Sequence, residues 1–379
     1  MHEAPVVVLA GGGTGGHLYP ALAIADALRE RRPDAHVVFV GAQRGLEARV
    51  LPARGEDHHL LPVHGIDRSR PLESWRAIVG LFVALLRVVR VFRRRRPEVV
   101  VVTGGYAGAP AGIVAGLSGI PLVLQEQNAE PGLVTRLLTR WATRVHVAYP
   151  EAIERLGADA RARLTGNPVR ARAVRSPERA RAELGIPRAV PLVVVIGGSQ
   201  GSLALNRVIG EVLRGIANGV LHRPEGLHLL WVTGPSHVDA ARSVMTEYES
   251  PAWVHPVGYV DDLPSALSAA DLAVSRSGAM STAELLDCGL PAVLVPFPGA
   301  AAGHQMHNAR ALERAGAAVV APQAELTGES LWAEIERLLD SPGLLAKMRQ
   351  AALALAHPTA AADIATDLET FLPAPRRAA

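Results

Sequence analysis

Short apolar runs rich in β-branched residues alternate with longer segments of helical periodicity along almost the whole chain. In the first half, such runs occupy residues 6–10, 36–41, 98–105, 121–127 and 144–149. Strands that are apolar on both faces and are separated by helices are typical of a parallel sheet covered on both sides. The pattern therefore predicts a doubly wound α/β sheet in this half of the chain.

A second series of the same kind follows and predicts a second sheet. Its runs occupy residues 191–201, 227–234, 252–260, 271–278, 291–297 and 317–322. A turn-rich segment and a charged helix interrupt the alternation at 165–181, and a chain of 379 residues is longer than one hydrophobic core usually grows. We therefore expect two Rossmann-like domains, residues 1–164 and 165–344, with a cleft between them.

Composition and charge narrow the class of protein. The net charge is only +3, but basic residues exceed acidic ones in residues 1–168 and the reverse holds in 169–379. The first half is therefore expected to face something anionic, or to carry no more than one basic run. The single cysteine, Cys288, cannot form an intramolecular disulfide and is expected to be a small buried thiol at a helix end. The N-terminal residues lack the basic n-region of a signal peptide, and we expect a cytoplasmic chain that at most lies on a membrane.

A glycine-rich segment, GGGTGGH at residues 11–17, follows the first predicted strand and precedes a helix. Gly11, Gly13 and Gly16 satisfy the G-x-G-x-x-G spacing of dinucleotide sites. Gly41, however, ends the second predicted strand, where such sites need an acidic residue for the ribose. A P-loop is excluded because no Gly-Lys-Ser/Thr follows. What remains is a backbone cradle for an anion or a polar sugar at a helix N-terminus, or only a tight turn.

Two further glycine loops also follow predicted strands. GGSQGS at 197–202 repeats the arrangement in the second half, with Ser199 and Gln200 as additional side-chain donors, and GGYAGAP lies at 104–110. In parallel sheets, ligands bind at the carboxyl ends of the strands, where such loops gather. Three glycine loops favour a sugar nucleotide, whose diphosphate and hydroxyl groups would use them, over tight turns alone.

Eight segments in a fixed order resemble those of one family. They are HLYP, GGYAGAP, QEQNAEPG, TGNPVR, GGSQG, GYVDDL, SRSGAMSTAE and HQMHNA. This ordered set resembles the MurG family, the bacterial UDP-N-acetylglucosamine:N-acetylmuramyl-(pentapeptide) pyrophosphoryl-undecaprenol N-acetylglucosaminyltransferases that make lipid II from lipid I. The resemblance implies a GT-B fold, two Rossmann-like domains with the active site between them, and it implies that the Ala-rich helical segment from about 345 to 379 packs back on the first domain. It also implies an inverting transfer that requires no dedicated catalytic metal, and it leaves stimulation by a divalent cation open.

The resemblance places most of the site for the donor, UDP-N-acetylglucosamine, in the second half. The residues that it assigns to the donor are Thr14, Gly15, Gly16, Asn128, Arg170, Ser199, Gln200, Val260, Met280, Ser281, Glu284 and Gln305. Glu284 is expected to accept hydrogen bonds from the ribose hydroxyls, as an ionised carboxylate can; an exposed helix position is the alternative. Gln305 follows the loop Gly299–Gly303, where the family usually has polar or acidic residues. This departure leaves a relaxed contact or an altered sugar preference open, with Asn308 expected to support the loop.

The acceptor, lipid I, is expected at the first half of the chain. The resemblance assigns Gly13 and Tyr106 to it, and residues 11–16 are expected to cradle its diphosphate. Displacement at C1 of the donor sugar needs a base near the attacking hydroxyl. His17 is the candidate, since an imidazole with an ordinary pKa of about 6.5 can take a proton at neutral pH. Glu126 is the rival base, and a capping or packing role is the alternative for His17.

Residues 72–100 combine an apolar helical face with six arginines within residues 87–96. The side chains expected to face a membrane are Trp75, Ile78, Phe82, Arg87 and Arg90. Such a helix is typical of an element that lies among anionic lipid headgroups, and a core helix with a solvated end is the alternative. Nucleic acid is not expected, because aromatic platforms and a nucleic-acid motif are absent. The resemblance implies the cytoplasmic side of the cell membrane, where lipid I is anchored, and is compatible with other cell-wall and division proteins as partners.

Two other functions stay open on the sequence alone. A UDP-N-acetylglucosamine epimerase on the same scaffold would use water rather than a lipid acceptor and would need no membrane face. A nucleotide-sugar sensor would bind the donor without turnover. The basic helix and the first glycine loop favour the transferase over the epimerase, and a His17 variant that retains donor affinity but loses activity would exclude the sensor.

Overall fold

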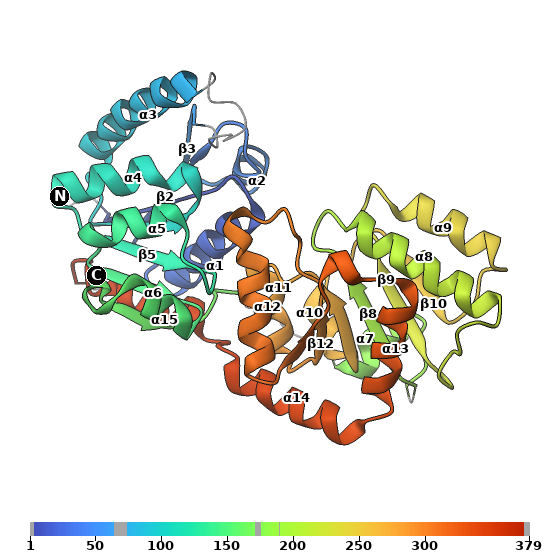
Figure 1. Ribbon diagram of the computed structural model, residues 1–379. Coiled ribbons are helices and arrows are strands. Elements are labelled where there is room, and N and C mark those ends of the chain that lie inside the picture. Colours follow the sequence, from blue (N-terminus) through green and yellow to red (C-terminus); the bar gives the residue numbers. More distant parts are fainter. Residues whose placement is uncertain (1–3, 64–73, 171–175, 189, 375–379) are drawn as a thin grey trace. The chain divides into compact units, whose positions relative to one another are not determined.

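The computed structural model describes residues 4–63, 74–170, 176–188 and 190–374, without the side chains of residues 74–78. The chain divides into two compact units. The first comprises residues 1–171 and 357–379, and the second comprises residues 172–356. Each unit is built on one parallel sheet flanked by helices (Figure 1). The expected α/β class with two doubly wound domains is confirmed.

The first unit contains a seven-stranded parallel sheet in the order β3-β2-β1-β4-β5-β6-β7. Its strands are β1 (Val6–Gly11), β2 (His36–Ala42), β3 (His58–Leu61), β4 (Val99–Gly104), β5 (Leu122–Glu126), β6 (Arg144–Val147) and β7 (Ala162–Leu164). Alternate residues enter different cores: Val8 and Ala10 lie on one face of the sheet, and Val7 and Leu9 on the other. Because both faces are buried, the strands appear in the sequence as continuous apolar runs.

Helices cover both faces of this sheet (Figure 1). The core on one face includes residues of α3 (Ser74–Arg95), α4 (Gly105–Ser118) and α5 (Leu133–Leu138), and these helices contact one another in that order. The core on the other face includes residues of α1 (Gly15–Arg31) and α15 (Ala360–Glu369). The remaining helical segments of the unit are α2 (Glu47–Ala53), α6 (Pro150–Leu156), η2 (Thr139–Trp141) and η3 (Ala158–Ala160).

The second unit contains a six-stranded parallel sheet in the order β10-β9-β8-β11-β12-β13. Its strands are β8 (Leu192–Ile196), β9 (His228–Val232), β10 (Val254–Val257), β11 (Leu272–Ser275), β12 (Ala292–Leu294) and β13 (Ala318–Val320). Its helical segments are α7 (Pro177–Glu183), α8 (Leu203–Ala217), α9 (Val238–Glu247), α10 (Leu263–Ser268), α11 (Ala279–Asp287), α12 (His304–Arg314), α13 (Gly328–Leu339), α14 (Pro342–Leu355), η4 (Ala301–Gly303) and η5 (Gln323–Glu325). Trp231 and Trp332 are the largest fully buried side chains of its core.

The chain passes between the two units twice, and both boundaries differ from the expected ones. Residues 165–171 belong to the first unit, where Thr165 N and Gly166 N both donate to the carbonyl oxygen of Val147 in β6. The C-terminal segment is two helices with different partners. Helix α14 stays in the second unit, where Met348 and Ala352 are buried, and only α15 packs on the first unit. Helical periodicity showed that the segment is helical but not where it changes units.

Among the described residues, none of the helices has the length and apolarity that crossing a membrane requires. Residues 99–125 carry no charged side chain. The structure divides them between β4, α4 and β5, so this uncharged stretch belongs to the core of the first unit.

Candidate active site

Each sheet has one point at which the order of its strands reverses direction. In the first unit this switch point lies between β1 and β4, and in the second unit between β8 and β11. Loops that leave two such strands diverge, and ligands of open α/β sheets bind in the crevice between them. All three glycine loops lie where strands end at these switch points. Gly11 ends β1 and residues 12–14 lead into α1, Gly104 ends β4 and Gly105 begins α4, and residues 197–202 follow β8.

The two glycine loops of the first unit are in contact. Thr103 Oγ1 donates to the carbonyl oxygen of His17 at 2.7 Å. Gly104 and Gly105 have φ values of +100° and +72°, and a Cβ on Gly105 would collide with the carbonyl oxygen of Gly12. Only glycine combines this backbone conformation with so close an approach. These glycines therefore set how closely the two loops approach each other at the switch point.

His17 lies at this switch point, in the first turn of α1. Its Nδ1 lies 3.0 Å from Oγ1 of Thr14, the N-cap residue of the helix. The ring of His17 packs on the glycine loop at residues 104–105, since a Cβ on Gly104 would lie 3.2 Å from Nε2 of the ring. The contact with Thr14 orients the imidazole, whose role as the base stays a prediction.

Tyr106 and Gly13, both predicted to contact the acceptor, lie against each other. A Cβ on Gly13 would lie 2.8 Å from Cε1 of the tyrosine ring. Burial, and then the charge of Glu47, raise the pKa of Tyr106, so its hydroxyl stays protonated and can donate a hydrogen bond. The structure thus brings Gly13, His17 and Tyr106 together at one switch point, whereas their binding roles stay predictions.

Glu47 is a residue of this site that sequence reasoning missed. It is fully buried at the start of α2. Its Oε1 accepts from Gly13 N at 2.9 Å and from Ala42 N at 2.8 Å, and its Oε2 lies 3.1 Å from Gly13 N. The signal in the sequence is weak, because this acidic residue is separated from Gly13 by 34 positions.

Glu126, the rival base, has a carboxylate that is already occupied. Oε1 accepts from Asn128 N at 3.0 Å and from Asn128 Nδ2 at 3.2 Å. Oε2 accepts from Gly132 N at 2.9 Å and from Thr135 Oγ1 at 2.6 Å, and the residue is 2% exposed. With four donors on its two oxygens, the carboxylate holds the loop that follows β5. The geometry favours His17 over Glu126 as the base.

In the second unit, Arg276 joins the two loops at the switch point. It follows β11, is buried, and donates through Nη2 to Ser202 Oγ at 2.8 Å and to Gln323 Oε1 at 2.6 Å. Its Nη1 donates to the carbonyl oxygen of Val295 at 3.0 Å. Burial lowers the pKa of Arg276, and no carboxylate pairs with it among the described residues. Arg276 belongs to the SRSGAMSTAE segment, yet nothing in the sequence alone indicates its role.

The donor residues predicted in the second unit lie at the carboxyl edge of its sheet. Ser199 and Gln200 are exposed on the glycine loop after β8. Met280 and Ser281 lie in the first turn of α11, and Glu284 lies one turn further along the same helix. The N-terminus of a helix attracts phosphate, because its first N–H groups lack intrahelical acceptors. The arrangement therefore suits a diphosphate near α11 and a hydroxyl-bearing group near Glu284.

Gln305 reaches the same edge from α12. Its Oε1 accepts from Phe297 N at 2.9 Å, and Ser277 Oγ donates to its backbone carbonyl at 2.8 Å. Asn308 is fully buried and donates through Nδ2 to the carbonyl oxygen of Ser277 at 3.2 Å. These contacts hold the loop before α11 against α12, whereas the support that Asn308 is expected to give to the loop at 299–303 stays a prediction.

Two other elements that are predicted to contact UDP-N-acetylglucosamine lie on loops. Val260 follows β10, two residues before Asp262, the N-cap of α10. The unusual loop 299–303 contains Ala302 with φ +49°. A left-handed conformation at a residue with a Cβ costs roughly 1–2 kcal/mol. The loop thus keeps a strained turn next to the helix that carries Gln305.

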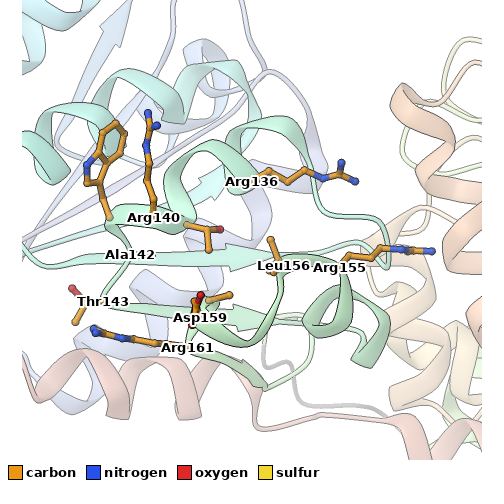
Figure 2. A pocket seen from close by; sticks show the side chains of 11 residues that line it. Arg136, Arg140, Ala142, Thr143, Arg155, Leu156, Asp159 and Arg161 are labelled. Atoms are coloured by element: carbon orange, nitrogen blue, oxygen red, sulfur yellow. The ribbon is translucent and has the colours of Figure 1, made fainter.

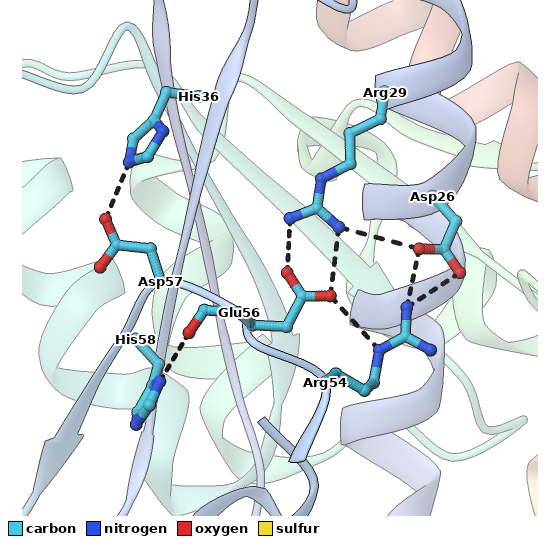
Figure 3. A network of polar contacts seen from close by, with 7 residues as sticks. All are labelled: Asp26, Arg29, His36, Arg54, Glu56, Asp57 and His58. Carbon is cyan, nitrogen blue, oxygen red and sulfur yellow. Dashed lines mark hydrogen bonds and ion pairs between the residues drawn. The ribbon is translucent and has the colours of Figure 1, made fainter. Parts of the chain in front are cut away.

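Arg170, predicted to lie near the nucleotide, belongs to the first unit. Its Nε lies 3.1 Å from Asp26 Oδ2 on α1. Asp26 is part of the ionic network in Figure 3, in which Arg54 contacts Asp26 and Glu56, and Arg29 also binds Glu56. Burial raises the pKa of Glu56, but the hydrogen bonds and charges of Arg29 and Arg54 outweigh it and hold this pKa below its ordinary value. The ion pair with Asp26 holds Arg170 against α1. The contact of Arg170 with the nucleotide stays a prediction.

A cavity of about 620 Å³ lies elsewhere in the first unit, beside arginine side chains (Figure 2). Thr143 and Arg161, two of its lining residues, directly precede β6 and β7, so it lies at the amino ends of these strands. Arg136 and Arg155 both pair with Glu130. Because the glycine loops are at the carboxyl ends of the strands, this cavity is separate from the candidate site.

Among the residues that the structure describes, no group of three or more His, Cys, Asp or Glu side chains is placed to hold a metal ion. Cys288 ends α11, and burial raises its pKa to about 12. Its thiol therefore stays protonated and is a poor nucleophile.

Comparisons with known proteins agree with this architecture. Residues 7–147 match the glycosyltransferase family 28 N-terminal domain, and residues 192–366 match the family's C-terminal domain. The chain is 38% identical over 359 residues, 93% of this chain and 96% of its relative, to "UDP-N-acetylglucosamine--N-acetylmuramyl-(pentapeptide) pyrophosphoryl-undecaprenol N-acetylglucosamine transferase" of Desulfitobacterium hafniense (strain Y51).

Two solved structures complete the comparison. The crystal structure of MurG from Acinetobacter baumannii has a TM-score of 0.75 and 26% identity, with 97% of this chain and 99% of that chain covered. A UDP-N-acetylglucosamine 2-epimerase has a TM-score of 0.62 at 17% identity, with 97% and 96% covered. At that identity the likeness to the epimerase shows the fold alone.

Proposed function

We infer that this chain, which belongs to the MurG family within glycosyltransferase family 28, transfers N-acetylglucosamine from UDP-N-acetylglucosamine to lipid I and so makes lipid II for peptidoglycan. Lipid I is undecaprenyl-pyrophosphoryl-N-acetylmuramyl-pentapeptide. The observation that carries the inference is a glycine loop at the switch point of each sheet, in a chain similar over nearly its whole length to transferases of that name.

The first unit would bind the acceptor and activate its hydroxyl. The 4-hydroxyl oxygen of N-acetylmuramic acid forms a bond to C1 of the donor sugar, and its proton passes to Nε2 of His17. The support for this role is the contact of Nδ1 with Thr14, which orients the ring at the switch point. The N–H groups of Gly15 and Gly16 begin α1 and would bind the acceptor's diphosphate, in place of the donor contacts that the resemblance assigns to these two residues.

The second unit would bind the donor and take up the charge of the leaving group. As the bond from C1 to the diphosphate breaks, the electron pair goes to the β-phosphate oxygen of UDP. Preorganised dipoles and cations aimed at developing charge are the usual way to lower such a barrier. The N-terminus of α11 and the buried guanidinium of Arg276 supply both kinds. We therefore propose that no resident metal is required and that a divalent cation would act only through the substrate's diphosphate.

The first experiment is UDP release from UDP-N-acetylglucosamine by the full-length protein, with and without a lipid I analogue. We expect release that depends on the analogue, together with a disaccharide product of inverted configuration. Acceptor-independent interconversion of the sugar would instead identify an epimerase, and donor binding without turnover would identify a sensor.

We also propose that the outer side of α3, α4 and α5 docks on the cytoplasmic surface of the cell membrane. Helix α3 buries Ala84, Val88 and Phe92 in the core, yet Phe82 and Leu86 on its outer side are 63% and 57% exposed. The exposed apolar residues of the neighbouring helices are Leu117 of α4 and Leu133 and Leu137 of α5. The interpretation of α3 as a core helix therefore applies to its inner side, and the interpretation as a membrane-facing helix applies to its outer side.

Charge supports the same surface as a membrane contact. Arg87 and Arg90 are exposed on α3, and its last turn carries three more arginines. Each basic residue near an anionic bilayer contributes about 1 kcal/mol. Trp75 and Ile78, predicted to face the membrane, have side chains outside the described residues.

Vesicle co-sedimentation tests this proposal. We expect the double variant Phe82→Glu/Leu86→Glu to lose binding to vesicles that contain phosphatidylglycerol, since each buried apolar side chain contributes about 1.5–3 kcal/mol. Val220→Glu is the matched control, because Val220 is 69% exposed in the second unit. Equal binding by the double variant and the control would refute this docking surface.

A further inference from the structure

Glu47 places an acidic side chain beneath the loop that binds an anion under the proposed function. The carboxylate is fully buried, and its described partners are backbone N–H groups of Gly13 and Ala42. Within the described part of the chain, no basic side chain lies within ion-pair distance of it. A negative charge at this place opposes the binding of a diphosphate, so its presence needs another explanation.

Three glycines make room for this carboxylate. A Cβ added to Gly12, Gly41 or Gly45 would collide with the Glu47 side chain. Gly12 has a positive φ, but Gly41 and Gly45 do not. At these two positions glycine is needed for space and not for backbone conformation. The loop after β1, the end of β2 and the segment after β2 are therefore all shaped around one acidic side chain.

The contact with Glu47 sets the direction of the Gly13 amide. Gly13 has φ +88°, and its N–H points to the buried carboxylate while its Cα side faces the ring of Tyr106. A ligand at the crevice would then meet the N–H groups of the next residues, Gly15 and Gly16, at the start of α1. The same turn carries His17, so the conformation of Gly13 determines where the helix and its imidazole begin.

We propose that Glu47 is a positioning residue for the acceptor: its two carboxylate oxygens lock the Gly12–Gly13 turn and thereby place the N-terminus of α1 and His17. This inference rests on the proposed function, which assigns the loop to lipid I. A carboxylate is required because it accepts with both oxygens, whereas a glutamine amide would turn an N–H₂ group toward an N–H donor. Glu47 itself does not touch the substrate.

Two variants test this role of Glu47, one by changing the carboxylate itself and the other by displacing it. Glu47→Gln removes one acceptor and keeps the size of the side chain. Gly45→Ala leaves the carboxylate intact but pushes it away from Gly13 with a single methyl group. The matched controls are Glu30→Gln, at an exposed position on α1, and Gly343→Ala, where an added Cβ meets nothing within 4 Å.

We expect both test variants to raise the KM for the lipid I analogue by about tenfold or more, the factor expected when a hydrogen bond to a charged group is lost. The KM for UDP-N-acetylglucosamine should stay unchanged, and the controls should match the wild type. An unchanged acceptor KM in a variant that melts like the wild type would overturn the proposal, as would an equal rise in both KM values. If Glu47→Gln fails to fold, Gly45→Ala alone decides.

Hydrogen exchange supplies a readout that does not depend on turnover. We expect amides of residues 11–17 to exchange faster in both test variants than in the controls. Unchanged exchange would show that Glu47 does not hold the loop. If the wild type shows no acceptor-dependent UDP release, the proposed function fails, whereas the exchange measurement still decides whether Glu47 fixes this turn.

Discussion

Replacing Glu126 with glutamine distinguishes a structural carboxylate from a catalytic base. The amide oxygen can still accept from both nitrogens of Asn128, and the Thr135 hydroxyl can turn to accept from the amide. Gly132 N, however, loses its acceptor. An unsatisfied buried N–H costs about 1–3 kcal/mol. For a unit of this size, a loss of about 2 kcal/mol lowers Tm by about 4–8 °C.

Thermal unfolding and steady-state UDP release measure the two effects separately. We expect a lower Tm for the first unit and a raised KM for the donor, because Asn128 lies on the loop that Glu126 holds. General base catalysis contributes roughly 10²- to 10⁴-fold to a rate, and we expect kcat to fall by much less than that. Glu154→Gln, at an exposed position on α6, is the control and should change neither quantity. An unchanged Tm together with a kcat lowered by about 10²-fold or more would make Glu126 the base and refute this reasoning.

Three further predictions concern the base, the core and the metal. His17→Ala should lower kcat about 10²- to 10⁴-fold with UDP affinity unchanged by calorimetry; an unaltered kcat would exclude His17 as the base. Burial, with the charges of Arg163 and Arg144, lowers the pKa of His146 to about 4. Because the unfolded chain takes up this proton near pH 6.5 and the folded chain only near 4, the free energy of unfolding should fall by about 3 kcal/mol as pH drops through this window. His146→Asn should flatten that pH profile in thermal melts, and an equally steep profile would contradict the assignment. EDTA should leave acceptor-dependent UDP release measurable; complete loss that one particular metal alone restores would show a resident metal.

The strands and the glycine loops could be predicted from the sequence because both are local signals. A strand buried on both faces appears as a continuous apolar run, and the runs predicted at 98–105 and 121–127 contain β4 and β5. Likewise, a glycine loop after a strand marks the carboxyl edge of the sheet wherever the strand lies. These features depend on neighbouring residues, so one sequence suffices to find them.

The partners that hold the loops could not be predicted, because they depend on distant contacts. Glu47 lies 34 positions from Gly13, and Arg276 lies 74 positions from Ser202. Neither residue lies in a sequence motif that indicates which loop the residue supports. Similarly, the helical pattern beyond residue 345 is the same in α14 and α15, and only packing separates them: α14 contacts α11 and α13, while α15 contacts α1. Local periodicity carries no information on such choices.

The two switch points use the same strand–loop–helix arrangement but place opposite charges beneath it. The first unit supports its loop with the Glu47 carboxylate, and the second supports its loop with the Arg276 guanidinium. Under the proposed function this difference follows from the chemistry. The acceptor's diphosphate carries the same charge before and after transfer, so its loop needs only a defined shape and can tolerate an anion below it. The donor's diphosphate gains negative charge as UDP leaves, and a buried cation stabilises that change more in the transition state than in the ground state.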